Sequence, residues 1–338
     1  MKHKILLLLP IMAFFATLPI HLYATNECLS PNETVWFRYP AQSWSEQALH
    51  IGNGYMGASF YGEVEKERFD IAEKTFWAGG PHAASDFNYG IIKGGKDKIA
   101  TIRQLIVERR FAEADSLSRI YMTGDYTNYG YFSMVGNLWI DFGKNKQPVQ
   151  NYLRGIDLST SRGFVEYTQG GVQFNREYFC SYPDKLMALH FTADKAGKIS
   201  FSLSHSLVYQ PEEVIESENG LTFNGIIREN GLGYTIRIKI VQQGGSVKVA
   251  HQRIVVEKAN EATVFYAVDT EYAPVYPLYK GENPQQNTGK VITKAITKGY
   301  ETVKNTHISD YQTLYNRVRL TLTGDTASEQ LPTNVRVK

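Results

Sequence analysis

Alternating apolar and polar residues predict that most of this chain folds into β-strands. The clearest pattern is at 234–240, where four large apolar side chains alternate with Thr, Arg and Lys. Residues 164–168 and 172–181 predict a hairpin that turns at Gly170-Gly171. Further strands are predicted at 35–44, 58–61, 69–71, 131–142, 186–191, 199–203, 246–251, 253–258 and 262–268. Many short strands separated by turn glycines predict a fold that is mainly β, a large antiparallel β-sandwich.

The hydrophobic period changes to that of a helix in two parts of the chain. Apolar residues share one helical face at 99–106 and again at 111–121, which predicts two helices inserted among the strands. We expect these helices to pack on the sheet and to carry no chemistry. Near the C-terminus, 292–303 and 308–314 predict a helical linker. His307 and Asp310 share one face of this linker, and packing or capping is the favoured role for both.

The stretch 51–81 has the most distinctive local pattern. It opens on Gly52-Asn53-Gly54, a turn of the kind that glycine forms at low cost, and two apolar runs around 62–66 predict a hairpin. It ends on an aromatic pair, Phe76-Trp77, followed by a Gly-Gly-Pro turn. A glycine turn, a hairpin and Trp77 close to the Glu73 carboxylate suit a loop that contacts a sugar. Ordinary turn and core roles explain the same residues, and both interpretations stay open at this point.

The first 24 residues predict an export signal. Lys2 and Lys4 precede a mostly apolar run at 5–22, and Pro10 and Pro19 disfavour a membrane-spanning helix. With cleavage near residue 24, the expected protein is exported to the periplasm or the extracellular space. No later segment is expected to span a membrane.

Composition and charge exclude several classes of function. The formal net charge is +2 over 338 residues, and the part after the predicted signal is close to neutral, so a nucleic-acid partner is not expected. The 22 Tyr suit sugar binding, although β-sheets also favour aromatic residues. A Pro- and Tyr-rich loop at 269–287 contains Glu271-Tyr272, which could face a ligand but ranks low. Cys28 and Cys180 allow one disulfide, but two cysteines do not make a disulfide framework.

Metal and cofactor sites are not expected. The histidines are scattered without ligand spacing, and two cysteines with them do not make a zinc site. The predicted set of sites therefore contains no metal site and no organic cofactor.

Three ordered motifs resemble glycoside hydrolase family 95, the α-L-fucosidase type. They are WFRYPAQSW at 36–44, GNGYMGA at 52–58 and EKTFWAGGP at 73–81. Weaker similarities continue at 131–142 and at 307–318. Where the family has Asn before the Glu, this chain has Ala72, and Asn137 stands where the family has Asp. Cys180 stands where the family tends to have a small residue, so the resemblance favours a buried free thiol there. The resemblance covers essentially all of residues 35–338.

The resemblance implies a domain organisation. It implies a signal peptide at 1–24, an N-terminal β-sandwich domain at 25–288 and a helical linker at 289–338 that leads to a catalytic (α/α)₆ barrel absent from this chain. In the family, the acid and base of an inverting hydrolysis of α-1,2-linked fucose lie on that barrel. No catalytic residue is therefore assigned here, and we expect the chain alone to be inactive.

The resemblance also implies partners and binding residues. The expected partners are a fucosylated glycan and the catalytic barrel. Asn53 and Glu73 would bond sugar hydroxyls or neighbouring backbone, and Trp77 would supply an apolar wall. The alternative for all three is that they only hold the turn and the hairpin together.

Three other functions stay open. The chain could be a free-standing, non-catalytic carbohydrate-binding β-sandwich, a domain that only braces a barrel, or the sandwich of a maltose-phosphorylase type of enzyme. A free-standing domain predicts a polar surface throughout, whereas a missing partner predicts an exposed apolar patch of roughly several hundred Å². The Trp-x-Gly-Gly-Pro motif favours the fucosidase interpretation.

Overall fold

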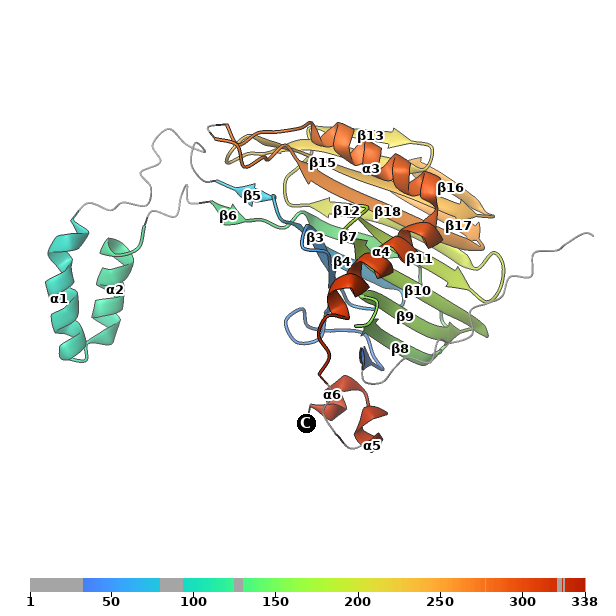
Figure 1. Ribbon diagram of the computed structural model, residues 1–338, viewed down its shortest axis with the longest axis horizontal. Coiled ribbons are helices and arrows are strands. Elements are labelled where there is room, and N and C mark those ends of the chain that lie inside the picture. The colour runs from blue at the N-terminus through green and yellow to red at the C-terminus, as the bar shows by residue number, and fades with distance from the viewer. Residues whose placement is uncertain are drawn as a thin grey trace, which may run out of the picture.

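The computed structural model describes residues 33–79, 94–124, 130–276, 278–320, 324 and 326–337. Their strands form two large antiparallel sheets (Figure 1). The larger sheet contains, in spatial order, β1 (Thr34–Phe37), β8 (Val149–Asp157), β9 (Arg162–Gln169), β10 (Val172–Ser181), β11 (Leu186–Ala193), β18 (Glu261–Thr270), β15 (Leu232–Gln243), β14 (Gly220–Ile227) and β13 (Glu213–Ser217).

The second sheet has seven strands in the described residues. In spatial order they are β16 (Ser246–Ala250), β17 (Arg253–Ala259), β12 (Ile199–Leu207), β7 (Gly136–Asp141), β4 (Lys66–Glu73), β3 (Met56–Phe60) and β2 (Leu49–Gly52). A small ribbon pairs β5 (Trp77–Ala78) with β6 (Tyr131–Phe132). The predicted class, mainly β with a large antiparallel sandwich, is confirmed.

The main core lies between the two large sheets. It contains inward-facing side chains of both, including Phe60, Phe69, Tyr178, Leu189 and Ile238, which are completely buried. The alternation of the strands supplies these side chains, since every second residue faces the other sheet.

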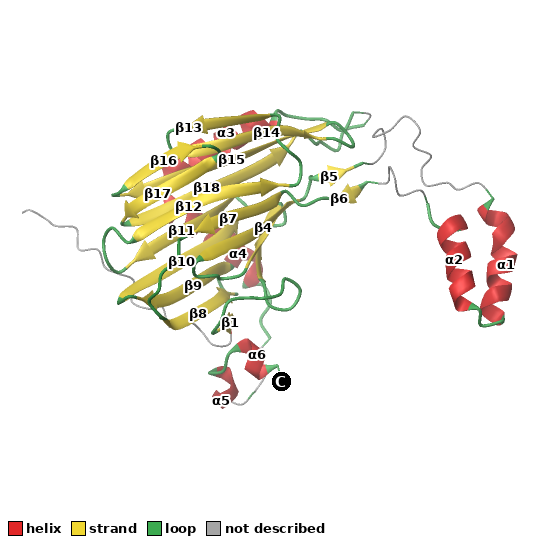
Figure 2. Cartoon of the chain, turned by 180° about the vertical axis from the view of Figure 1, so that it is seen from behind, coloured by secondary structure: helices red, strands yellow, loops and turns green. Residues whose placement is uncertain are grey.

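Two helices cover the outer side of the larger sheet. α3 (Pro284–Lys298) and α4 (Tyr300–Tyr315) bury Ile292, Ala295 and Val303 in a second core against β10, β11 and β18 (Figure 1). Seen from the other side, they lie partly behind the strands (Figure 2). The chain breaks between the helices at Gly299, whose φ is 76°. His307 is buried and stacks on Phe179, with 4.7 Å between ring centroids, so the favoured packing role is confirmed for it.

The inserted helices are present, but their expected packing on the sheet is wrong. α1 (Gly95–Val107) and α2 (Phe111–Tyr121) pack on each other through Ile102, Leu105 and Ala114. Figure 1 and Figure 2 show this hairpin standing apart from the sheets. Its apolar stripes are satisfied by the partner helix, and a helical period does not reveal which surface a stripe meets.

The predicted strand at 131–142 is interrupted, because Ser133–Val135 separate β6 from β7. The strand predicted at 35–44 ends at Phe37, and β2, β8, β13 and β14 had no prediction. At the C-terminal end, α5 (Thr326–Glu329) and α6 (Thr333–Arg336) follow, and the Thr333 hydroxyl accepts a hydrogen bond of 2.9 Å from the Trp36 amide on edge strand β1.

Two other expectations concern residues outside the described part. The predicted signal at 1–24 and Cys28 lie there, so neither the signal nor a Cys28–Cys180 disulfide is tested. Cys180 itself is buried in the core, as favoured, and forms no disulfide with a described residue. No helix among the described residues is long and apolar enough to cross a membrane.

Candidate functional site

Asn53 organises the turn between β2 and β3. Its Oδ1 accepts hydrogen bonds from the amides of Tyr55 and Met56, at 2.9 and 2.8 Å. Its Nδ2 donates to the carbonyl of Ser181, at 2.8 Å, and so ties this turn to the end of β10 in the other sheet. The Asn53 side chain therefore bonds neighbouring backbone, which is one of the two kinds of contact predicted for it.

Glu73 ends β4 with its side chain facing into the sandwich. It is 1% exposed, and its Oε2 accepts from the amide and the hydroxyl of Thr75, at 2.9 and 2.6 Å. Because the Thr75 proton is used in this way, the Thr270 hydroxyl, 2.5 Å away, is the donor to Thr75. Oε1 is buried and has no hydrogen-bond partner among the described residues.

This environment makes Glu73 an unusual carboxyl group. Burial raises its pKa to about 7, against the lowering effect of the two Thr75 bonds, and the charge of Asp269 adds to the rise. Asp269 lies at the end of β18, where its Oδ1 accepts from the Tyr55 hydroxyl at 2.6 Å and its Oδ2 from Asn287 Nδ2 at 3.0 Å. Both carboxyl groups are thus held by their own chain.

Trp77 lies on β5 and is 47% exposed. Its Nε1 donates to the carbonyl of Lys74 at 2.9 Å, and its ring meets Phe132 edge-on with 5.9 Å between centroids. These contacts fix the indole with much of its surface open to solvent, as an apolar wall requires.

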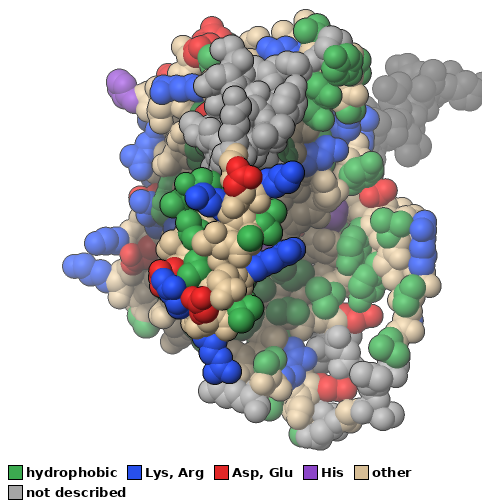
Figure 3. Space-filling model, turned by 90° about the vertical axis from the view of Figure 1, so that its left-hand side faces the viewer, with side chains coloured by type: hydrophobic (Ala, Val, Ile, Leu, Met, Phe, Trp, Pro, Cys, Tyr) green, Lys and Arg blue, Asp and Glu red, His purple; other side chains and the backbone are tan. Residues whose placement is uncertain are grey.

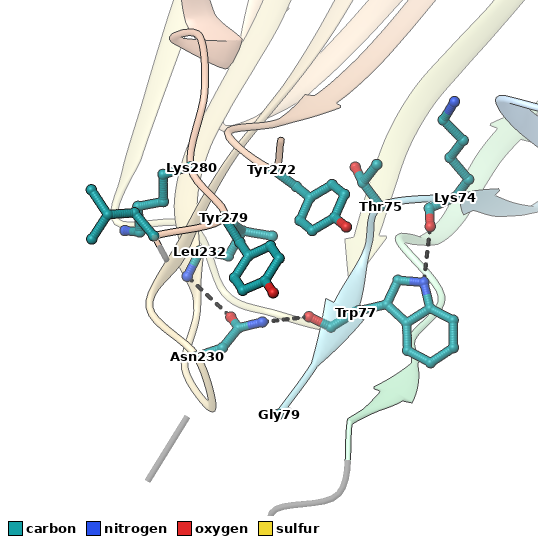
Figure 4. Close-up of a pocket in the computed structure, with 10 residues that line it drawn as sticks. Lys74, Thr75, Trp77, Gly79, Asn230, Leu232, Tyr272, Tyr279 and Lys280 are labelled. Carbon is teal, nitrogen blue, oxygen red and sulfur yellow. Dashed lines mark hydrogen bonds between the residues drawn. The ribbon is translucent and has the colours of Figure 1, made fainter. Parts of the chain in front are cut away.

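A pocket of about 560 Å³ lies beside this segment. It is formed by three parts of the chain that are far apart in sequence: the end of β4 with β5, the turn between β14 and β15, and the loop after β18. Its lining residues are Lys74, Thr75, Trp77, Gly79, Asn230, Leu232, Tyr272, Leu278, Tyr279 and Lys280. In Figure 4, the rings of Tyr272 and Tyr279 lie on one side and the segment with Thr75 and Trp77 on the other.

Hydrogen bonds between main chain and side chains frame this pocket. Asn230 Nδ2 donates to the carbonyl of Trp77 at 2.8 Å, and Asn230 Oδ1 accepts from the Leu232 amide at 3.0 Å (Figure 4). Lys280 donates to the carbonyl of Gly231 at 3.0 Å and pairs with Glu271 at 2.6 Å. The three chain segments are therefore tied to one another at the pocket rim.

The lining has no carboxyl group. Among the described residues that line the pocket there is neither Asp nor Glu. Hydrolysis of a glycosidic bond by inversion uses two carboxyl groups about 6.5–9.5 Å apart on either side of that bond. The pocket offers aromatic rings, hydroxyl groups and backbone for binding, and no acid–base pair.

The three predicted residues come together only in part. The Asn53 turn and the end of β4 are neighbours, because the Lys74 amide donates to the Tyr55 carbonyl at 2.9 Å. Thr75 connects Glu73 with the pocket, but only Trp77 of the three predicted residues is in its lining. Their roles in sugar binding stay predictions.

The sequence did not predict most of the residues that line the pocket. Asn230, Tyr279 and Lys280 had no signal beyond turn residues and a Pro- and Tyr-rich loop, and Tyr272 was noted but ranked low. The signal that indicates this part of the site is a loop rich in tyrosine directly after a buried strand, since binding residues often lie on loops held by a rigid scaffold.

Exposed apolar side chains gather on the same side of the molecule. The β5–β6 ribbon exposes Trp77, Tyr131 and Phe132, and the α1–α2 hairpin exposes Val107 and Phe111. Figure 3, which looks onto the side with the hairpin, shows several hydrophobic side chains at the surface among Lys and Arg. This surface is not polar throughout.

Comparison with known proteins agrees with this architecture. The family model for the N-terminal domain of glycosyl hydrolase family 65 matches residues 35–274. The chain belongs to this family. The resemblance to an N-terminal domain of glycoside hydrolases is thereby confirmed.

Curated relatives carry fucosidase names. α-L-Fucosidase 2 of Arabidopsis thaliana is 28% identical over 321 residues, covering 87% of this chain and 37% of the relative. Probable α-fucosidase A of Aspergillus niger is 27% identical, covering 89% of this chain and 39% of the relative. The chain thus spans less than half the length of these relatives.

A solved structure shares the fold. The structure titled putative kojibiose phosphorylase from human microbiome superposes with a TM-score of 0.57 at 10% sequence identity, over 89% of this chain and 40% of that one. The similarity again covers less than half of the compared protein.

Proposed function

We propose that this chain is the N-terminal sandwich domain of an exported glycoside hydrolase of the α-L-fucosidase type. Such an enzyme removes α-1,2-linked fucose from glycans with inversion. The observation that carries the proposal is the alignment of fucosidase relatives over 87% and 89% of the chain. The ordered motifs at 36–44, 52–58 and 73–81 support it.

The chain alone is proposed to be inactive. The relatives extend well beyond the aligned part, which is 37% and 39% of their length. The pocket lining lacks the two carboxyl groups that hydrolysis needs. Glu73 and Asp269 are engaged by hydrogen bonds within the chain, and we propose that the acid and the base lie on a further, helical domain, as the resemblance implies.

The exposed apolar side chains support a partner on the side of β5, β6 and the α1–α2 hairpin. Phe111 is 62% exposed and Val107 76%, although both are large apolar residues on a well-formed helical hairpin. A free-standing sugar-binding domain predicts a polar surface here. The apolar surface favours contact with the catalytic domain.

Asn53, Glu73 and Trp77 have different proposed roles in that assembly. Asn53 shapes the β2–β3 turn, and Glu73 holds Thr75 at the pocket rim through its two hydrogen bonds. Trp77 presents its exposed ring to the glycan or to the catalytic domain. Export follows from the predicted signal at 1–24.

The test compares two proteins, the chain from residue 25 to 338 and the same chain extended by the coding sequence downstream of Lys338. Each is assayed with an aryl α-L-fucoside and with an aryl β-D-galactoside as the control substrate. We expect no turnover by the chain alone, and hydrolysis of the fucoside with inversion, followed by NMR of the product anomer, by the extended protein. Turnover by the chain alone, or a downstream sequence that encodes no helical domain, would contradict the proposal.

A further inference from the structure

We propose that the pocket between Tyr272, Tyr279 and Leu232 is a non-catalytic subsite for a neutral sugar unit, complete within this chain. The choice of L-fucose as the sugar rests on the proposed function, whereas the location of the subsite does not. Tyr272, Tyr279 and Leu232 lie outside the three sequence motifs, and the proposal assigns to the loop after β18 a ligand-binding role.

The two tyrosine hydroxyls are available to a ligand. Tyr272 is 44% exposed and Tyr279 36%, and neither hydroxyl has a hydrogen-bond partner among the described residues. Figure 4 shows both hydroxyls turned toward the segment that carries Thr75 and Trp77. By contrast, the hydroxyls of Tyr55 and Tyr234, near the same end of the sandwich, donate to Asp269 and to the Tyr209 carbonyl.

The walls combine these hydroxyls with apolar surface. Leu232, which is 6% exposed, lines the pocket together with Leu278 and the two tyrosine rings. A sugar ring has an apolar face and a rim of hydroxyl groups, so aromatic and aliphatic walls with a few hydroxyl partners fit it. The volume of about 560 Å³ lies within the range of roughly 300–1,000 Å³ that small-molecule sites have.

The charges favour a neutral ligand. Asp and Glu are missing from the described lining, and of its two lysines Lys280 is paired with Glu271 at 2.6 Å. The ammonium of Lys74 lies over the Tyr55 ring, at 4.9 Å from its centroid. Lys280 is neutralised by its ion pair, and the Lys74 ammonium keeps its charge but points away from the two tyrosines (Figure 4). The tyrosine-lined part of the described lining therefore offers no unpaired charge to an anionic sugar.

Hydrogen bonds among described residues hold both ends of the loop that carries the tyrosines. The Ala273 amide donates to the Tyr279 carbonyl at 3.1 Å, and the Gly281 amide donates to the Glu271 carbonyl at 2.6 Å. The Glu271 carboxylate also accepts from the Gly233 amide at 2.9 Å, which fixes the loop to β15. A loop that is ordered before binding loses less conformational entropy when a ligand enters.

A 6-deoxy sugar fits this lining better than its 6-hydroxy analogue. A methyl group gains contact with the leucine side chains, whereas a hydroxyl placed against them loses its hydrogen bonds to water. We therefore expect L-fucose to bind more tightly than L-galactose.

The test measures binding of fucosyl-α-(1→2)-galactose to the mature chain, from residue 25 to 338, by isothermal titration and by saturation-transfer NMR. We expect Tyr272→Phe and Tyr279→Phe each to weaken binding about three- to tenfold, because each removes one hydroxyl and leaves the ring. Tyr182→Phe is the matched control, since Tyr182 is 61% exposed and lies outside the pocket. This variant should bind as the unaltered chain does.

Two results would overturn the subsite: no saturation transfer to the disaccharide, or binding that both tyrosine variants leave unchanged. The circular dichroism of each variant shows whether its fold is retained. The subsite and the glycosidase proposal fail separately, because binding is measured without turnover. If the chain binds the sugar but the extended protein is inactive, the subsite is supported and the glycosidase proposal is contradicted. If the extended protein is active but the chain binds no sugar, only the subsite is contradicted.

Discussion

Two buried carboxyl groups lie near opposite ends of the same strand, one in a closed structural region and the other beside the candidate site. In β4, residues 67, 69, 71 and 73 face the interior, so Glu67 and Glu73 flank the completely buried Phe69 and Ile71. Burial raises the pKa of each carboxyl group to about 7. Each also leaves one buried oxygen without a hydrogen-bond partner among the described residues, Oε2 of Glu67 and Oε1 of Glu73, but the charges around the two groups differ.

The Glu67 end is closed and compensated. Oε1 of Glu67 accepts from the amides of Tyr61, Gly62 and Arg68, at 3.0, 3.0 and 3.1 Å. The Arg176 guanidinium, 2% exposed on the opposite sheet, lies 4.0 Å from Oε2. This network holds the β3–β4 turn against the larger sheet.

The Glu73 end is open and uncompensated. The Glu73 carboxylate accepts hydrogen bonds only from Thr75 among the described residues, and its neighbour Asp269 is also acidic. A pocket and an exposed Trp lie next to it. A buried carboxyl group without a buried cation destabilises the fold, and such costs gather at functional sites. A raised pKa alone therefore does not distinguish a structural carboxyl group from a candidate site. The missing buried cation and the adjacent pocket make the Glu73 end the candidate.

Replacing Arg176 should have the largest effect. Arg176→Met keeps much of the volume but leaves Glu67 without its cation and frees the carbonyls of Glu63 and Val64, which Arg176 binds at 2.7 Å. We expect the free energy of unfolding to fall by about 3–5 kcal/mol, measured by urea denaturation. Arg119→Ala, at an exposed ion pair with Asp115, is the control and should cost less than about 0.5 kcal/mol. Similar losses for both would show that the Glu67 end is not a charge-compensated lock.

Removing the charge of Glu73 should change how stability depends on pH. Its pKa is about 7 in the folded chain and 4.5 ordinarily, so the folded state binds the proton more tightly. Its contribution to stability is therefore greatest below pH 4.5 and is lost as the pH rises to about 7. At about 1.4 kcal/mol per unit, these values set an upper limit of roughly 3 kcal/mol.

When the pH is raised from 5 to 8, the free energy of unfolding should therefore fall less in Glu73→Gln than in the unaltered chain. Urea denaturation at both pH values measures this, with Glu218→Gln as a control at an exposed position. If the free energy of unfolding fell by the same amount in Glu73→Gln as in the unaltered chain, Glu73 would not be the uncompensated group.

The sequence predicts β4 as a strand but not the importance of its ends. The apolar run predicts a strand only at 69–71, whereas the alternation of every second residue places Glu67 and Glu73 on the buried face. The same holds for Arg176, which continues the inward row of Val172, Phe174 and Tyr178 on β10. A charged residue in such a row has a partner on another strand, and local periodicity does not show which one.

The pocket was harder to predict for a different reason. Trp77, Asn230 and Tyr272 are brought together by the pairing of distant strands, and the loop after β18 has no periodic pattern. The family resemblance of the motif at 73–81 predicts one wall of the pocket, the segment that contains Trp77. The α1–α2 hairpin shows the same limit, since its period predicted both helices correctly but not that each packs on the other.

Two tryptophans, one near each end of β4, give the smallest and most specific prediction. Trp77 is open at the Glu73 end, and its indole points away from the two pocket tyrosines (Figure 4). Trp139 lies on β7, opposite Arg68 of β4. The Lys66 ammonium lies over the Trp139 ring, 4.7 Å from the ring centroid. Because the Trp77 ring lies outside the tyrosine-lined part of the pocket, we expect it to contact the second unit of a disaccharide. Trp77→Ala should weaken binding of fucosyl-α-(1→2)-galactose about threefold and leave binding of L-fucose unchanged.

Trp139→Ala is the matched control, and it should alter binding of neither sugar. Saturation-transfer NMR with the two sugars measures both variants under the same conditions. Equal loss of both sugars in Trp77→Ala would mean that the indole supports the pocket and does not extend it. A loss in Trp139→Ala would show that the Glu67 end also binds glycan, and the contrast between the two ends of β4 would then no longer hold.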